Sequence, residues 1–138
     1  MNMGKSLRQI DDELPNGFHD ALLRAVTLDL VSNSASLRLH LFVGEPDAAS
    51  EEAREAYRGA TLTLEELMYF VIDVPDRWDV RPGGRVMIDA GDATDHSNPR
   101  APTERSALPA GAFAYWIFVH EWNCFIHVAA RGAVLQWE

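Results

Sequence analysis

The stretch that decides the fold is residues 112–137, AFAYWIFVHEWNCFIHVAARGAVLQW. β-Branched and aromatic side chains, which favour extended backbone, recur along it and are interrupted where the chain can reverse. The elements predicted in order are a strand over 112–121, a reversal at 122–123, a strand over 124–130, a turn at 131–132 and a strand over 133–137. The C-terminus therefore predicts a three-stranded antiparallel meander.

The first strand of this meander is apolar on both of its faces. Trp116 and Phe118 point to one side and Tyr115 and Ile117 to the other, because side chains alternate along a strand. Such a strand is either central in its sheet and covered on both sides or part of an interface between copies of the chain. A homo-oligomer formed through the aromatic C-terminal strands is therefore one of two expectations.

A second hairpin is indicated over residues 22–43. Apolar and polar residues alternate over 26–30 and again over 37–43, which is the period of half-buried strands. The small polar residues 32–34 between the two runs favour a turn. We predict a β-hairpin here.

Residues 46–58 have the composition of a short surface helix. Asp47 can cap its start, alanines follow, and Gly59 stands where a helix would stop. Glutamate and arginine at Glu51/Arg54 lie on one helical surface, which supports the same interpretation.

Residues 60–74 fit two patterns. Leucines and Val71 form a helical stripe, and Thr63 with Glu66 fits a capping box. Alternation over 68–74 instead fits a strand. We favour a strand over 68–74, preceded over 60–64 by another strand or an extended segment.

The remaining segments complete a mainly β chain. Residues 1–17 are polar and predict a flexible lead-in, residues 85–90 predict a short strand, and residues 91–111 predict a long polar loop. The fold class expected is mainly antiparallel β, at the margin of α+β, as a sandwich or partly open barrel with one short surface helix. A single domain over 18–138 follows from the length.

The charge is strongly acidic. The 138 residues carry a net charge of −9, and residues 45–79 hold ten carboxylates and three arginines, a net of −7. An acidic surface repels phosphate, so nucleic acid and anionic membranes are excluded as expected partners. The acidic stretch serves either solubility or the docking of a basic protein.

The single cysteine and the lengths of the apolar runs indicate the cell compartment in which the protein is expected. Cys124 has no partner for an internal disulfide, which suits a reducing compartment. The longest apolar stretch, residues 110–119, is too short to span a bilayer as a helix, and the N-terminus shows no signal peptide. We expect a cytoplasmic protein.

His19 and Asp20 form the first candidate for binding. A carboxylate beside an imidazole can orient the ring for acid–base work. The pair can equally form a turn in which Asp20 accepts bonds from nearby backbone N–H groups, and this interpretation is favoured.

His120, Glu121 and His127 form the second candidate. Zinc sites of the His-Glu-x-x-His type place both imidazoles on one helical face, whereas these histidines stand seven residues apart across a predicted reversal. Sheet histidines with hydrogen-bond partners are the favoured interpretation. We assign no catalytic residue, no metal and no cofactor.

Loop residues complete the candidates. Trp122, like Trp78, is either an interface anchor or a cover for the core edge. The acidic residues around Gly91 are the set Asp89, Asp92, Asp95 and His96. Their spacing does not match calcium loops, so a solvated loop is expected. The candidate binding residues are His19, Asp20, His120, Glu121, Trp122 and His127.

The two ends of the chain resemble small bacterial proteins. The start FHDA at 18–21, followed by two alternating strands, and the segments FVHEW at 118–122 and IHV at 126–128 carry the likeness. They resemble small β-rich bacterial proteins of unknown function, some of which are immunity proteins that neutralise a neighbour's toxin. The resemblance leaves residues 45–110 uncovered. It implies a β-rich cytoplasmic bacterial domain, and it identifies no catalytic residues.

Two functions remain as hypotheses. The first is a non-enzymatic interaction protein, immunity-like, which predicts a contiguous exposed acidic or aromatic patch. The second is a small-molecule or metal-dependent enzyme. It predicts that the polar side chains of 19–20 and 120–127 converge around a concave pocket.

Overall fold

The computed structural model describes residues 4–75, 84–93 and 108–138. Trp78, Asp95, His96 and most of the loop expected over 91–111 lie outside the described residues. The described elements are α1 (Leu7–Glu13), β1 (Ala21–Asp29), β2 (Ser34–Phe42), α2 (Glu51–Arg54), β3 (Tyr57–Ile72), β4 (Met87–Asp92), β5 (Phe113–Val119) and β6 (Cys124–Trp137).

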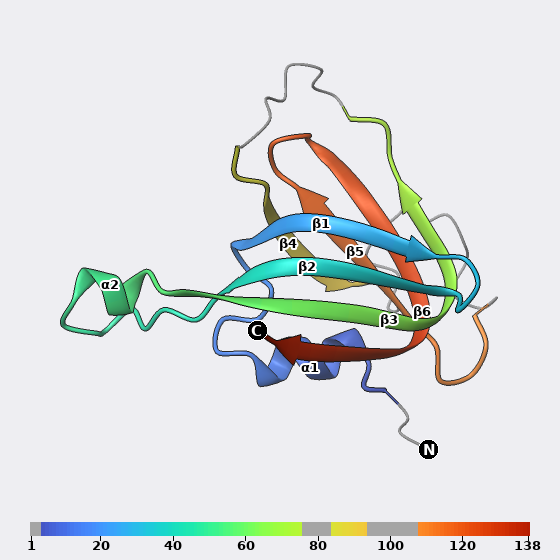
Figure 1. The fold of residues 1–138 in the computed structure, drawn as a ribbon, viewed down its shortest axis with the longest axis horizontal. Coiled ribbons are helices and arrows are strands. Elements are labelled where there is room, and N and C mark those ends of the chain that lie inside the picture. The colour runs from blue at the N-terminus through green and yellow to red at the C-terminus, as the bar shows by residue number, and fades with distance from the viewer. Residues whose placement is uncertain (1–3, 76–83, 94–107) are drawn as a thin grey trace.

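The strands form one closed antiparallel sheet in the order β1-β2-β3-β6-β5-β4 (Figure 1). The ring is uneven, because β1 and β4 close it through only two residue pairs, Ala21 with Ile88 and Leu22 with Met87. β3 and β6, by contrast, pair over most of their length. The predicted fold class, mainly antiparallel β, is confirmed.

Alternate side chains fill the interior of this barrel. Leu37, Leu39 and Leu41 of β2 are each 1% exposed, and they meet Ile126 and Val128 of β6 in one core cluster. Full burial of such a side chain is worth about 1.5–3 kcal/mol. The hairpin predicted over 22–43 is confirmed, because β1 and β2 pair antiparallel. The leucines of β2 attach this hairpin to the core.

Part of the segment expected to be a flexible lead-in folds as α1. Ser6 caps the helix by accepting a bond from the Gln9 backbone N–H, while the Gln9 side chain accepts one from the Ser6 N–H. Leu7 and Ile10 are buried in the core. The helix was missed because its apolar residues are few and its stability comes from packing on the barrel.

Asp11 fastens α1 to the barrel. Its Oδ2 accepts a hydrogen bond of 2.8 Å from the Tyr115 hydroxyl, and its Oδ1 accepts one of 2.8 Å from the Phe18 N–H. Burial of Tyr115, followed by the bond to Asp11, raises the pKa of this phenol far above its ordinary value. The hydroxyl is therefore protonated at neutral pH and donates to Asp11.

The turn predicted at 131–132 is wrong, and the C-terminus therefore forms the two-stranded β5–β6 hairpin and not the predicted three-stranded meander. β6 runs through Arg131 and Gly132 without a break, and β3 pairs with it on both sides. Gly132 instead allows a close approach, since an added Cβ would lie 3.2 Å from the Cα of Gly4. Residues 133–137, which were expected to form a separate strand, are the end of β6. The three consecutive strands that pair as antiparallel neighbours are β4, β5 and β6.

β3 explains the mixed pattern of residues 60–74. It is one strand with an irregular register between Leu67 and Tyr69, and Glu66 has a φ of 52°. The bulge changes which side chains face the core, so Leu64, Leu67 and Phe70 all contact it at intervals of three. That interval imitates a helical stripe. The strand interpretation over 68–74 is confirmed through Ile72.

The helix expected over 46–58 is much shorter. Ser50, not Asp47, caps α2 by accepting a bond of 3.1 Å from the Ala53 N–H, and residues from Tyr57 onward belong to β3. α2 lies at the tip of a long projection between β2 and β3, which extends away from the barrel (Figure 1). Within the described residues, neither helix has the length and apolar character needed to cross a bilayer.

Candidate functional site

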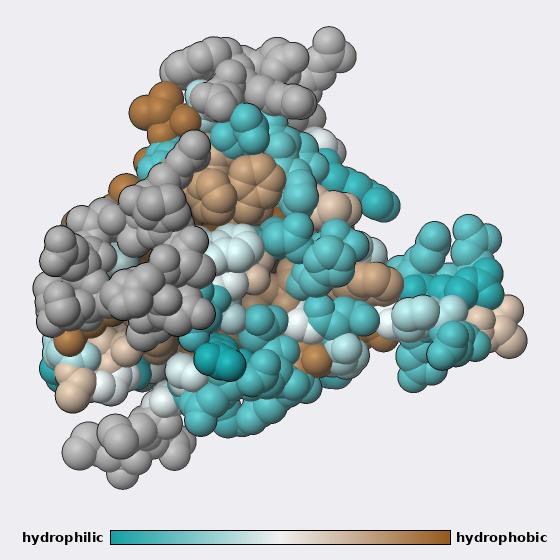
Figure 2. All heavy atoms as spheres, turned by 180° about the vertical axis from the view of Figure 1, so that it is seen from behind, coloured by the Kyte–Doolittle hydropathy of each residue, from teal (hydrophilic) through white to brown (hydrophobic). Residues whose placement is uncertain are grey.

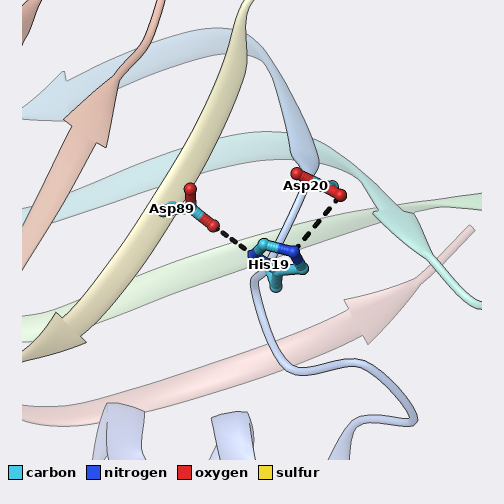
Figure 3. A group of neighbouring side chains, drawn as sticks. All are labelled: His19, Asp20 and Asp89. Atoms are coloured by element: carbon cyan, nitrogen blue, oxygen red, sulfur yellow. Dashed lines mark hydrogen bonds and ion pairs between the residues drawn. The ribbon is translucent and has the colours of Figure 1, made fainter.

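One carboxylate joins two histidines that are far apart in the sequence. Asp89 Oδ1 lies 2.6 Å from His19 Nδ1, and Asp89 Oδ2 lies 2.7 Å from His120 Nε2. Asp20 lies on the other side of the His19 ring, with its Oδ2 3.3 Å from His19 Nε2 (Figure 3). We call His19, Asp20, Asp89 and His120 the His–Asp cluster.

The backbone places each member of the cluster. His19 and Asp20 lie in the turn before β1, where buried Phe18 anchors the chain and Asp20 has a φ of 57°. Aspartate tolerates this left-handed conformation better than most residues do. A turn is thus present at this pair, but the Asp20 carboxylate lies beside the His19 ring, and the turn brings the imidazole to Asp89.

Asp89 and His120 lie at the outer surface of the barrel. Ile88 and Ala90 contact the core, so Asp89 between them faces outward. It pairs in register with Phe118, and His120 follows two residues later, just beyond β5. The seam between β1 and β4 therefore carries the cluster.

Hydrogen bonding governs the charges of the cluster. The bond to Asp89 is the main cause that raises the pKa of His19, and nearby Asp20 adds to it. Burial acts to raise the pKa of Asp89, but the bonds from His120 and His19 outweigh it and lower that pKa. The carboxylate is therefore ionised at neutral pH and accepts from both rings.

The cluster is open to solvent. The side chains of His19, His120 and Asp89 are 69%, 40% and 28% exposed. His19, Asp20 and Asp89 each offer one atom that could bind a metal, and these three atoms lie within 4.8 Å of one another. Two carboxylates and an imidazole at this separation can share a cation.

Glu121 and Trp122 have structural contacts instead. Glu121 Oε2 accepts a bond of 2.8 Å from the Met87 N–H, which supports the start of β4. Trp122 is half-buried against the core cluster, in keeping with the expectation that it covers the core edge.

His127 lies away from the cluster. Its side chain is only 3% exposed, and its Nε2 lies 3.2 Å from Asp73 Oδ2 at the end of β3. The ring stacks on Phe125 with centroids 6.0 Å apart. His127 thus belongs to the buried outer surface of β6, as expected for a sheet histidine.

A row of aromatic rings connects the two histidine sites. Phe125 contacts Trp116 edge to face at 5.9 Å and Phe118 at 5.1 Å, and Phe118 contacts His120 at 5.0 Å. Trp116 lies over Gly91 of β4, where any Cβ would overlap the indole ring. The apolar side chains on the outer face of β5, Trp116 and Phe118, are therefore members of this aromatic row.

Asp89 is the residue that sequence reasoning missed. The strand predicted over 85–90 includes it and is present as β4, but its side chain was grouped with those of Asp92, Asp95 and His96 as part of a solvated loop. The signal available was the alternation of Ile88, Asp89 and Ala90, which puts a lone carboxylate on the outer face of a strand. Its histidine partners could be found only from the fold.

The projection carries a second polar feature. Its exposed carboxylates are Glu45, Asp47, Glu51, Glu52 and Glu55. The neighbouring cations make other contacts: Arg54 donates to the Ala48 carbonyl at 2.9 Å, and Arg58 lies 4.7 Å above the Trp137 ring. In the described part of the chain, none of the five carboxylates takes part in an ion pair. Figure 2 shows the projection as a hydrophilic protrusion.

A groove of about 510 Å³ lies between α1 and the end of β6. Ile10, Leu14, Leu135 and Trp137 contribute apolar walls, and Lys5 and Glu13 form an ion pair of 2.7 Å at its border. No member of the His–Asp cluster lines this groove.

Comparisons with known protein families, with curated proteins and with solved structures gave no match.

Proposed function

We propose that this protein is a non-enzymatic interaction module of the bacterial cytoplasm, immunity-like, that binds a basic protein partner through its acidic projection. The observation that carries this proposal is the set of five exposed carboxylates on the projection, none of them in an ion pair within the described residues. The projection is a contiguous acidic patch of the kind that the interaction hypothesis requires.

The two arginines offset the negative charge of this surface only in part. Arg54 is held by backbone carbonyls and Arg58 by an indole ring, so neither neutralises a carboxylate of the projection directly. Uncompensated like charges on an extended element steer a basic protein towards it and accelerate association. Such an interface weakens as salt increases, because the charges are exposed and screened.

The arrangement of the histidines supports binding over catalysis. The enzyme hypothesis requires His19, His120 and His127 around one pocket. His127 is instead buried beside Asp73, and the groove of about 510 Å³ is lined by other residues. The His–Asp cluster is an open surface feature, which gives little protection from bulk water to a reacting group.

The test is a comparison of two double charge reversals in pull-downs from the source bacterium at low salt. E52K/E55K reverses exposed carboxylates on the projection, and D12K/E65K makes the same change in net charge at exposed positions elsewhere. We expect wild type and D12K/E65K to retain the same basic protein, identified by mass spectrometry, and E52K/E55K to lose it. Equal retention by all three proteins, or no basic partner at all, would contradict the proposal.

A further inference from the structure

We propose that His19, Asp20 and Asp89 bind a divalent first-row transition metal ion of the Zn²⁺ type, with His120 as the outer partner that orients Asp89. This site is independent of the acidic projection and of the partner proposed for it.

One ligand atom from each of the three residues lies within 4.8 Å of the other two, which is close enough for them to be brought to one ion by a small movement. Two ligands bound to one tetrahedral metal at about 2.0–2.2 Å lie about 3.3–3.5 Å apart. His19 Nε2 and Asp20 Oδ2 already lie 3.3 Å apart. Asp89 Oδ1 instead lies 2.6 Å from the other ring nitrogen, Nδ1. Because the two nitrogens of one imidazole point in divergent directions, the His19 ring must turn, or the Asp20 side chain must move, before one nitrogen and both carboxylates can share an ion.

The surroundings permit this adjustment. The His19 side chain is 69% exposed, so its ring can turn to present one nitrogen to the ion. Asp20 follows directly in the same turn, whereas Asp89 is fixed on β4. Three protein ligands leave a position for water, and the exposed setting supplies it.

His120 supplies the support that such ligands need. Its Nε2 bonds to Asp89 Oδ2 at 2.7 Å, which leaves Oδ1 directed at His19. Phe118 packs edge to face on the His120 ring at 5.0 Å and helps to fix its orientation. Outer partners of metal ligands act in this way, and their loss typically lowers metal affinity about 10–100-fold.

The donor set also indicates the class of ion. One imidazole nitrogen and two carboxylate oxygens suit Zn²⁺ and its first-row neighbours. Ca²⁺ takes about six to eight oxygen ligands, which two carboxylates do not provide. The two negative carboxylates balance the charge of a divalent ion when the imidazole is neutral.

The experiment is a calorimetric titration of the untagged full chain with ZnCl₂ at neutral pH, after removal of metal with a chelator. We expect one equivalent of Zn²⁺ to bind with a Kd of about 1–10 µM, which corresponds to about 7–8 kcal/mol. H19Q and D89N should abolish measurable binding, and H120Q should weaken it about 10–100-fold. Ca²⁺ in excess should not compete.

H40Q is the matched control, because His40 lies on β2 outside the cluster. H40Q should bind Zn²⁺ as wild type does. Histidine side-chain NMR spectra on the same samples should show Zn²⁺ shifting the His19 signals, with circular dichroism confirming that each variant is folded. The proposal fails if folded H19Q binds Zn²⁺ as wild type does, if H40Q or H127Q weakens binding as much as H19Q, or if wild type binds no Zn²⁺.

Discussion

His19 Nδ1 lies 2.6 Å from Asp89 Oδ1, and this contact crosses the weakest seam of the barrel. β1 and β4 share only two residue pairs, Ala21 with Ile88 and Leu22 with Met87. The His19–Asp89 bond adds one side-chain contact between the two sides of that seam. His120, which follows β5, makes a hydrogen bond to the same carboxylate. The cluster therefore contributes to closure of the ring as well as to the proposed metal site.

The seam should be sensitive to pH. The pKa of His19 is raised in the folded protein, so its contribution to stability is complete below the unfolded pKa of about 6.5 and is lost as pH rises through the folded pKa. The pKa of Asp89 is lowered, so its contribution is present above about 3.9 and is lost on acidification. The wild-type protein should therefore be more stable than D89N, and the difference between their free energies of unfolding should be largest at mildly acidic pH.

Urea unfolding of both proteins in the presence of chelator measures this difference. The cluster is largely exposed, so the maximum difference should be about 1 kcal/mol or less and should shrink towards pH 8. D12N, at an exposed carboxylate of α1, serves as the control and should show no such profile. A wild-type advantage over D89N that does not vary with pH would contradict the linkage to His19.

Loss of the Asp11 carboxylate should weaken the attachment of α1 to the barrel. D11A removes the acceptor for both the Tyr115 hydroxyl and the Phe18 N–H, and the buried hydroxyl is left without that bond. Each unsatisfied buried group costs about 1–3 kcal/mol. We expect D11A to lower the free energy of unfolding by about 2–4 kcal/mol, while Y115F alone loses less. Equal stability of D11A and wild type would exclude this role.

Any side chain at Gly91 should disturb the outer aromatic row. The Cβ of G91A would overlap the Trp116 ring, so the indole must move or β4 must shift. Overpacking of this kind costs about 1–3 kcal/mol in thermal or chemical unfolding. W116L should relieve much of the loss in the double variant, because it removes the ring that G91A meets. Additive losses in the double variant would show that the two residues do not interact.

Glu66, which precedes the bulge of β3, offers a stabilising change. Glu66 has a φ of 52°, a conformation that disfavours a side chain but suits glycine. E66G should therefore raise the free energy of unfolding by up to about 1 kcal/mol, offset in part by glycine's extra entropy in the unfolded chain. E65G, one residue earlier in β3 and without a positive φ, should be destabilising. Destabilisation of equal size in both variants would contradict strain at Glu66.

The sequence by itself determined the class of the fold and the residues of its main hairpin. Alternation over 22–43 predicted β1 and β2. The leucine face of β2 is buried against the core as this pattern requires, whereas Leu28 of β1 is 48% exposed. The aromatic run predicted that β5 is either covered on both sides or part of an interface between copies of the chain. The interior core covers one of its faces, and on the other Trp116 and Phe118 are half-buried beside Phe125 of β6. The histidines and Asp20 were also identified by their chemistry alone.

Only the tertiary structure decided which polar residues meet. His19, Asp89 and His120 come from three separate elements, and their convergence depends on the closure of the sheet between β1 and β4. The bulge between Leu67 and Tyr69 and the continuous course of β6 past Gly132 likewise depend on strand pairing, not on local preference. Local patterns report what one residue requires from its neighbours in the chain, whereas hydrogen bonds across a closed barrel join residues that share no local pattern.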